Sequence, residues 1–91
     1  MSLNNYTEEA RHFLEKMNAL NEDVELKLKW LDEEFQLLND AVDKQDKNKI
    51  QHQIYDMLFI LFEISAEYNL DLDSEWKFGR KRKQEKYLTD L

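Results

Sequence analysis

The sequence predicts an all-α protein, and two observations carry that prediction. The 91 residues include one glycine and no proline, and 36% are charged, so nothing inside the chain interrupts helices. Apolar residues also recur three and four positions apart, which is the spacing of one helix face. With short links between helices, the expected architecture is a four-helix bundle in a single domain, 1–91, with residues 1–6 as a loose tail.

The first helix is expected from about Glu8 to Leu20, with Thr7 as its N-cap. Its apolar face carries Phe13, Met17 and Leu20. Asn21 is the expected cap of the next helix.

The second helix is expected from about Glu22 to Asp43. A stripe with heptad spacing runs along it. The stripe consists of Val24, Leu28, Leu31, Phe35, Leu38 and Val42. A weaker second seam consists of Leu26, Trp30, Leu37 and Ala41.

After a polar loop, Asp43 to Asn48, the third helix is expected from about Lys49 to Tyr68. Its stripe consists of Ile50, Ile54, Met57, Leu61 and Ile64. The fourth helix is expected to be capped by Asp73 or Ser74 and to run to about Leu88.

Apolar residues cover nearly the whole circumference of the third helix, so we expect it to pack against another subunit as well. With the second seam of the second helix as a further interface, this predicts a homodimer or homotetramer.

Composition limits the kinds of function that fit. The chain has no cysteine, which excludes a disulfide framework and a thiolate site, and its two histidines, at positions 12 and 52, are far apart for zinc. The absence of an 18-residue apolar run and of a signal-peptide pattern predicts a cytoplasmic protein without a membrane partner. Residues 1–73 carry 17 acids and 7 bases, which argues against nucleic acid as a partner.

The C-terminal segment has the opposite charge, with 6 bases and 3 acids in residues 74–91. Bases there are either favourable charges near a helix C-terminus or ligands for phosphate.

Acidic residues recur on helix faces that can meet. Glu33 and Glu34 flank the second seam, and Asp56, Glu63 and Glu67 share one side of the third helix. Carboxylates brought together across antiparallel helices would attract a hard cation such as Mg²⁺. In a chain with 20 acids, helically spaced carboxylates are also expected on an ordinary solvated face.

The stretch KWLDEEFQLLNDAV, with IYDMLFILFEISAEYNLDLDSEW and GRKRKQEKYL, resembles the MazG-like all-α nucleoside triphosphate pyrophosphohydrolases. That superfamily has the pattern EExxE, a spacer, then ExxD, on two antiparallel helices. Glu33, Glu34 and Asp56 match it. Leu37 stands at the third glutamate and Gln53 at the ExxD glutamate, so two of the five acids are missing.

The resemblance implies hydrolysis of nucleoside triphosphates to the monophosphate and pyrophosphate, with Mg²⁺ or Mn²⁺. The metal would be held by Glu33, Glu34 and Asp56, with one neutral oxygen from Gln53. Arg80, Lys83 and Lys86 would contact substrate phosphates, and Trp30 would stack on the base.

Two alternatives stay open. Because Leu37 and Gln53 are not acids, the protein could bind a nucleotide or a protein partner without turnover. The heptad stripe and the apolar third helix would also suit a purely structural oligomerisation module.

Overall fold

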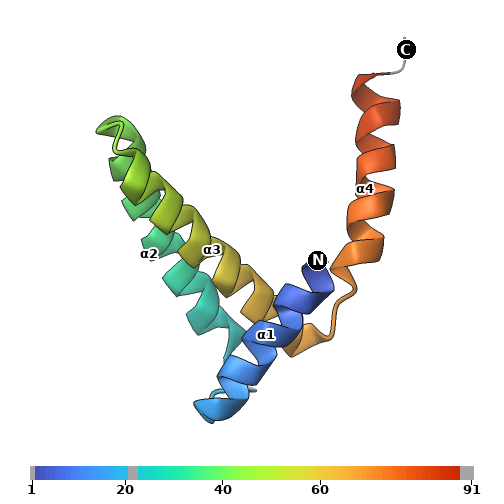
Figure 1. Ribbon diagram of the computed structural model, residues 1–91, viewed down its shortest axis with the longest axis horizontal. Helices are drawn as coiled ribbons and strands as arrows, with labels where there is room; N and C mark the ends of the chain where they lie inside the picture. Colours follow the sequence, from blue (N-terminus) through green and yellow to red (C-terminus); the bar gives the residue numbers. More distant parts are fainter. Residues whose placement is uncertain (1, 21–22, 89–91) are drawn as a thin grey trace.

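The computed structural model describes residues 2–20 and 23–88, and within them every regular element is a helix. Four helices follow one another along the chain (Figure 1). They are α1, Leu3–Lys16; α2, Val24–Asp43; α3, Lys47–Tyr68; and α4, Leu72–Tyr87. The all-α prediction is therefore confirmed for this part of the chain.

Helix α1 begins five residues earlier than expected, at Leu3 instead of Glu8. Ser2 is its N-cap, and the Ser2 hydroxyl accepts a hydrogen bond from the backbone N–H of Asn5. Thr7 lies inside the helix, where its hydroxyl donates to the carbonyl of Leu3. The prediction of a loose tail over residues 1–6 is thus wrong for residues 3–6.

The other helix boundaries differ from expectation by a few residues. Asp23 caps α2, Asp46 caps α3 and Asp71 caps α4, each by accepting a backbone N–H from the first turn of its helix. The expected cap Asn21 lies outside the described residues. Asn69, the C-cap of α3, takes the left-handed conformation that suits a helix C-terminus.

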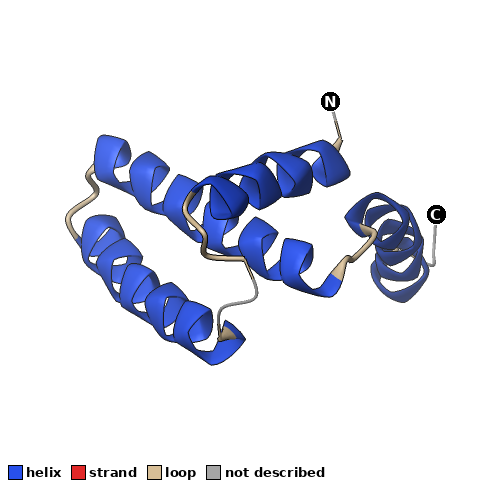
Figure 2. Ribbon diagram, turned by 90° about the horizontal axis from the view of Figure 1, so that it is seen from below, coloured by secondary structure: helices blue, strands red, loops and turns tan. Residues whose placement is uncertain are grey.

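Helices α2 and α3 form an antiparallel hairpin, and α1 packs across α3 (Figure 1). Helix α4 packs mainly against α1 and points away from the hairpin, as the view from below also shows (Figure 2). Within one chain, α4 therefore does not pack alongside the other three helices, as a four-helix bundle would require.

Inside the hairpin, α2 and α3 face each other through the sides that carry Lys27, Glu34, Asp56 and Glu63, rather than through their apolar stripes. The α2–α3 seam contains Lys27, Trp30 and Glu34 of α2 and Asp56, Ile60 and Glu63 of α3, which line one pocket. Ala41 and Gln53 continue these two faces along their helices. Lys27 and Ala41 are the buried residues of α2, and Ile60 and Glu63 are among those of α3. Of the second seam of α2, Ala41 is buried within the chain, whereas Leu26, Trp30 and Leu37 remain at least 38% exposed. Its role as a subunit interface stays a prediction.

Both predicted stripes remain at least partly exposed. Each stripe follows the seam of its own helix by one residue, which places it about 100° further around the helix axis. Because the two helices run in opposite directions, this rotation brings both stripes to the same side of the hairpin. We call the resulting surface the apolar face. It consists of Val24, Leu28, Leu31, Phe35, Leu38, Val42, Ile50, Ile54, Met57, Leu61 and Ile64, none of which is buried.

The opposite side of α3 is covered by α1 through aromatic pairs. The Phe13 and Phe59 rings meet edge to face with centroids 5.4 Å apart, and those of Tyr6 and Phe62 lie 5.6 Å apart. Such pairs add to the apolar burial that fixes α1 on the hairpin.

The N-termini of α1 and α4 cap each other. Asp73 accepts hydrogen bonds from the backbone N–H groups of Leu3 and Asn4, at 2.8 and 3.4 Å. In return the Asn4 side-chain oxygen accepts from the N–H of Leu72 at 2.9 Å, and its amide donates to Asp71. Free N–H groups at two helix ends are thereby satisfied, which holds the start of α4 on α1.

In the part of the chain that is described, none of the helices combines the length and the apolarity that a membrane crossing requires.

Candidate functional site

One pocket lies along the α2–α3 seam and is closed at one end by α1. It combines carboxylates with aromatic rings, and we call it the acid–aromatic pocket. Its lining residues are Phe13, Leu14, Met17, Ala19, Lys27, Trp30, Glu34, Tyr55, Asp56, Phe59, Ile60 and Glu63, around a volume of about 750 Å³. This size falls within the range of small-ligand sites in proteins.

One acid from each half of the predicted motif lines this pocket. Glu34 is seven residues after Lys27, and Asp56 is seven residues before Glu63. Because Lys27 faces Glu63 across the seam, equal steps along antiparallel helices bring Glu34 opposite Asp56. Both carboxylates, together with Trp30, line the same space.

Three buried polar atoms of the seam lack a hydrogen-bond partner in the described structure. They are Nζ of Lys27, Oε2 of Glu34 and Oε1 of Gln53. Buried polar atoms normally have partners, and an unsatisfied one costs free energy. Three such atoms in one seam indicate a place where a ligand, an ion or water supplies the missing contacts.

Asp56 is held by a neighbour on its own helix. Its Oδ2 lies 3.0 Å from Nε2 of His52, one turn earlier, and the pair is partly exposed. Sequence reasoning assigned no chemistry to His52, although its position four residues before Asp56 places the two side chains on one helix face.

Glu33 and Leu37 lie differently from Glu34. Glu33 is exposed and does not line the pocket. Leu37, at the position of the third glutamate in the MazG-like pattern, is 51% exposed. Among the described residues, no three acidic or histidine side chains come close enough together to hold a metal ion by themselves.

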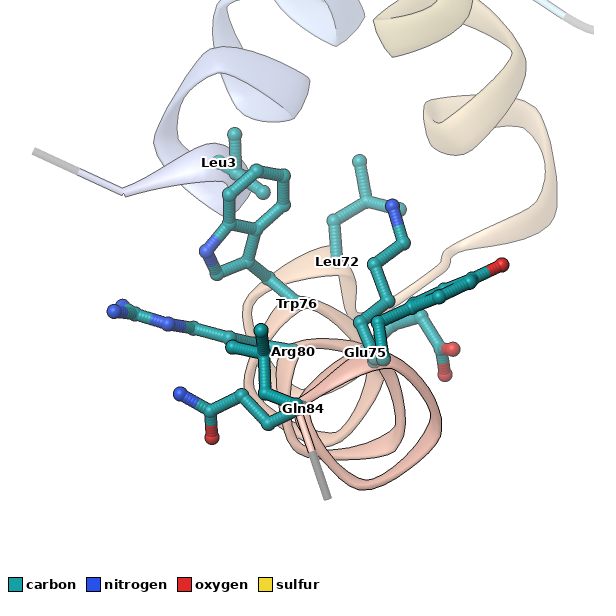
Figure 3. Close-up of a pocket in the computed structure, with 10 residues that line it drawn as sticks. Leu3, Leu72, Glu75, Trp76, Arg80 and Gln84 are labelled. Atoms are coloured by element: carbon teal, nitrogen blue, oxygen red, sulfur yellow. The ribbon is translucent and has the colours of Figure 1, made fainter. Parts of the chain in front are cut away.

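The predicted phosphate ligands lie on α4, away from this pocket. Arg80 and Lys83 line a separate apolar groove on α4, where Trp76 lies beside Leu3 (Figure 3). Since the main contact of α4 is with α1, one chain does not bring Arg80, Lys83 and Lys86 to Glu34 and Asp56.

Sequence reasoning missed Lys27, the largest fully buried side chain of the described residues. The signal was present, because Lys27 continues the spacing of three and four residues that links Trp30, Glu34, Leu37 and Ala41. Phe13 and Phe59, which close the pocket between α1 and α3, were not assigned to it either, because their meeting depends on how α1 packs.

Comparison of the chain with protein-family models, with curated proteins and with solved structures finds no match.

Proposed function

We propose that the protein is a MazG-like nucleoside triphosphate pyrophosphohydrolase that binds its substrate in the acid–aromatic pocket. The observation that carries this proposal is the position of Glu34 and Asp56, which come from the two halves of the acid motif and line one pocket with Trp30. Buried oxygens of Glu34 and Gln53 that accept no hydrogen bond support a site that is completed by a bound group.

We propose Mg²⁺ or Mn²⁺ as the metal, because all the ligands proposed for it are oxygens. Magnesium in nucleotide sites is usually held by one or two carboxylates, with waters and substrate phosphates completing its coordination. Glu34 and Asp56 would supply the carboxylates and Gln53 a neutral oxygen. The ion would neutralise phosphate charge and activate water. The role of the exposed Glu33 as a further ligand stays a prediction.

The reaction would be attack of water on the α-phosphorus. The bond from that phosphorus to the bridging oxygen breaks, and pyrophosphate leaves with the bonding electrons. The chain's own contribution is to orient the triphosphate and the water, with His52 holding one oxygen of Asp56 and Trp30 offering a surface for the base.

We also propose that the protein is a homodimer joined through the apolar face. Eleven apolar side chains that are at least partly exposed form one surface on α2 and α3. Two copies that meet through this surface would enclose a core between four helices. The heptad spacing of the α2 stripe suits a self-complementary contact between two copies. Phosphate contacts from Arg80, Lys83 and Lys86 would then require α4 of a second copy.

Binding without turnover remains the second candidate. It is favoured by Leu37 at the third acid position and by the ammonium of Lys27 within the seam, both of which reduce the capacity for metal. A purely structural module, the third possibility, predicts no rise in melting temperature with any nucleotide.

The deciding experiment is pyrophosphate release from the common nucleoside triphosphates with Mg²⁺ and with Mn²⁺. Wild-type turnover that falls at least about 100-fold in Glu34→Gln and in Asp56→Asn supports the proposal, since even residues behind metal ligands contribute about 10–100-fold. Asp32→Asn removes a neighbouring exposed carboxylate outside the pocket and should leave the rate nearly unchanged. Nucleotide binding without pyrophosphate release would favour the second candidate.

A further inference from the structure

Helix α4 carries an apolar groove that the described residues of one chain leave open to solvent. The groove has a volume of about 780 Å³. Trp76 lies beside Leu3 toward the start of the helix (Figure 3), and Tyr87 and Leu88 line the groove toward its end. Trp76 and Tyr87 are each 67% exposed. Because α4 packs mainly against α1 and points away from the hairpin (Figure 1), neither ring is covered by α2 or α3.

The centre of the groove is a glycine that packing within the chain does not require. Gly79 is the one glycine of the sequence, and its backbone is not in the left-handed region. A Cβ placed there would lie 3.4 Å from Nη2 of Arg82, the movable end of an exposed side chain. Glycine inside a helix lowers stability relative to alanine and is useful where another backbone approaches closely. Gly79 therefore indicates a partner that packs against this groove.

Positive charge borders the groove. Arg80 and Lys83 line it, and residues 74–91 carry 6 bases and 3 acids. Residues 1–73 have the opposite balance, with 17 acids and 7 bases. A partner that suits the groove presents apolar side chains beside carboxylates, and a second copy of this chain has such a surface.

That surface lies on α2, and we call it the acidic strip. Its residues follow one another at spacings of four and three, which places them along one side of the helix. They are Leu26, Trp30, Glu33, Leu37 and Asp40, and all five are exposed. Lys27 and Ala41, which are buried, lie between the strip and the apolar face of the same helix. The strip is therefore a second surface, distinct from the apolar face.

We propose that α4 of one copy packs along the acidic strip of a second copy, and that each copy contributes both surfaces to the contact. The aromatic rings of the groove cover the apolar residues of the strip, and the bases at its centre meet the carboxylates of Glu33 and Asp40. The side chain of Asp40 remains 62% exposed in its pair with Lys44, so it can accept a second cation. A reciprocal contact of this kind fits a two-fold dimer. This inference rests on the proposed dimer and not on hydrolysis.

Cysteine cross-linking tests the contact cleanly, because the chain has no cysteine of its own. One copy carries Leu37→Cys in the strip, and the other carries Gly79→Cys at the centre of the groove. The two are mixed in urea, refolded together and treated with a short bis-maleimide. We expect a covalent dimer from this mixture and almost none when Lys77→Cys, on the opposite side of α4, replaces Gly79→Cys. Equal yields from the two mixtures would overturn the proposal.

Charge reversal then assigns the contact to the acids and bases. Arg80→Glu with Lys83→Glu, added to the copy with the groove cysteine, should abolish the cross-link because carboxylates then face carboxylates. Glu33→Lys with Asp40→Lys, added to the copy with the strip cysteine, should restore it. A cross-link that persists through the first reversal, or one that the second does not restore, would contradict the assignment.

The mass of the refolded mixture separates this inference from the proposed dimer. A dimeric mixture that forms no link between strip and groove would refute the contact of α4 and leave the dimer through the apolar face standing. A monomeric mixture would refute both. In a single chain that carries both cysteines, a link within the chain in place of one between copies would show that α4 folds onto its own hairpin, which also refutes the proposal. None of these results depends on pyrophosphate release.

Discussion

The ammonium of Lys27 faces the carboxylate of Glu63 across the seam between α2 and α3, with Nζ and Oε2 4.0 Å apart. This pair and the Glu34–Asp56 pair lie along one interface, and the apolar stripes of the same helices face outward. The hairpin therefore places ionisable groups at its centre. Buried ion pairs of this kind contribute little to stability compared with apolar packing, and the proposed ligand site would give a reason for their presence here.

Stability measurements on variants of Lys27 and Glu63 should reveal the free-energy cost of burying this ion pair. We expect Lys27→Met alone to lower the free energy of unfolding by about 3–5 kcal/mol, because the buried carboxylate of Glu63 loses its cation. Combining it with Glu63→Leu should restore stability to the wild-type value or exceed it by about 1–4 kcal/mol. Urea unfolding measures both. A double variant that is as unstable as the single one would show that the pair stabilises the fold.

The apolar face predicts the oligomeric state. Light scattering at micromolar concentration should give twice the mass of the chain. Phe35→Glu places a charge in the middle of this face and should yield monomers, whereas Gln36→Glu, the exposed neighbour outside it, should leave the dimer intact. A monomeric wild-type protein would refute the proposed dimer, and dissociation of both variants would place the contact elsewhere.

The mutual caps predict that Asn4 anchors α4. Asn4→Ala removes the acceptor for the Leu72 N–H and should cost about 1 kcal/mol, as is typical for the loss of a helix cap. Amide exchange at the start of α4 should increase more than at the centre of α3. Unchanged exchange in α4 would show that the junction does not hold this helix.

Acid should loosen the same junction. Hydrogen bonds from the side chain of Asn4, then from the hydroxyl and the N–H of Ser74, lower the pKa of Asp71 from 3.8 to about 2. Because the pKa is lowered in the folded protein, this contribution is fully present above pH 4 and is lost as the pH falls toward about 2. Titration of the Asp71 carboxyl by NMR in Asn4→Ala should give a pKa nearer to 3.8. No change would remove Asn4 as the main cause.

The two adjacent glutamates should differ in importance. Glu34 lines the pocket with a buried oxygen, whereas Glu33 is exposed. We therefore expect Glu34→Gln to reduce metal-dependent nucleotide binding at least about tenfold and Glu33→Gln to reduce it less. Calorimetric titration with Mg²⁺ and a nonhydrolysable triphosphate measures both. The reverse order would mean that the pocket is not where the metal binds.

The helical class, the number of helices and the acid-bearing faces of α2 and α3 follow from composition and from residue spacing. Composition and spacing do not show which other element, or which second copy, each face packs against. The apolar stripe through Leu31 and Leu38 was expected inside the chain, but a helix pair can bury one seam within itself and leave another for a second copy. Spacing alone does not decide which seam is used.

The start of α1 and the direction of α4 could not be predicted for a related reason. Asp73 stabilises the N-terminus of α1 from a position about 70 residues away, and no local pattern reveals such a contact. Lys27 was overlooked because a lysine at the end of an apolar seam resembles any exposed helix residue until burial is known.

The central claim, that nucleotide binds beside Trp30 in the acid–aromatic pocket, can be tested most directly by tryptophan fluorescence. The chain has two tryptophans, and Trp76→Phe leaves Trp30 as the only one. We predict saturable quenching of Trp30 by nucleoside triphosphate in the presence of Mg²⁺, with weaker binding in Glu34→Gln. Unchanged emission in Trp76→Phe, together with quenching of Trp76 in Trp30→Phe, would place the nucleotide in the α4 groove and contradict the account.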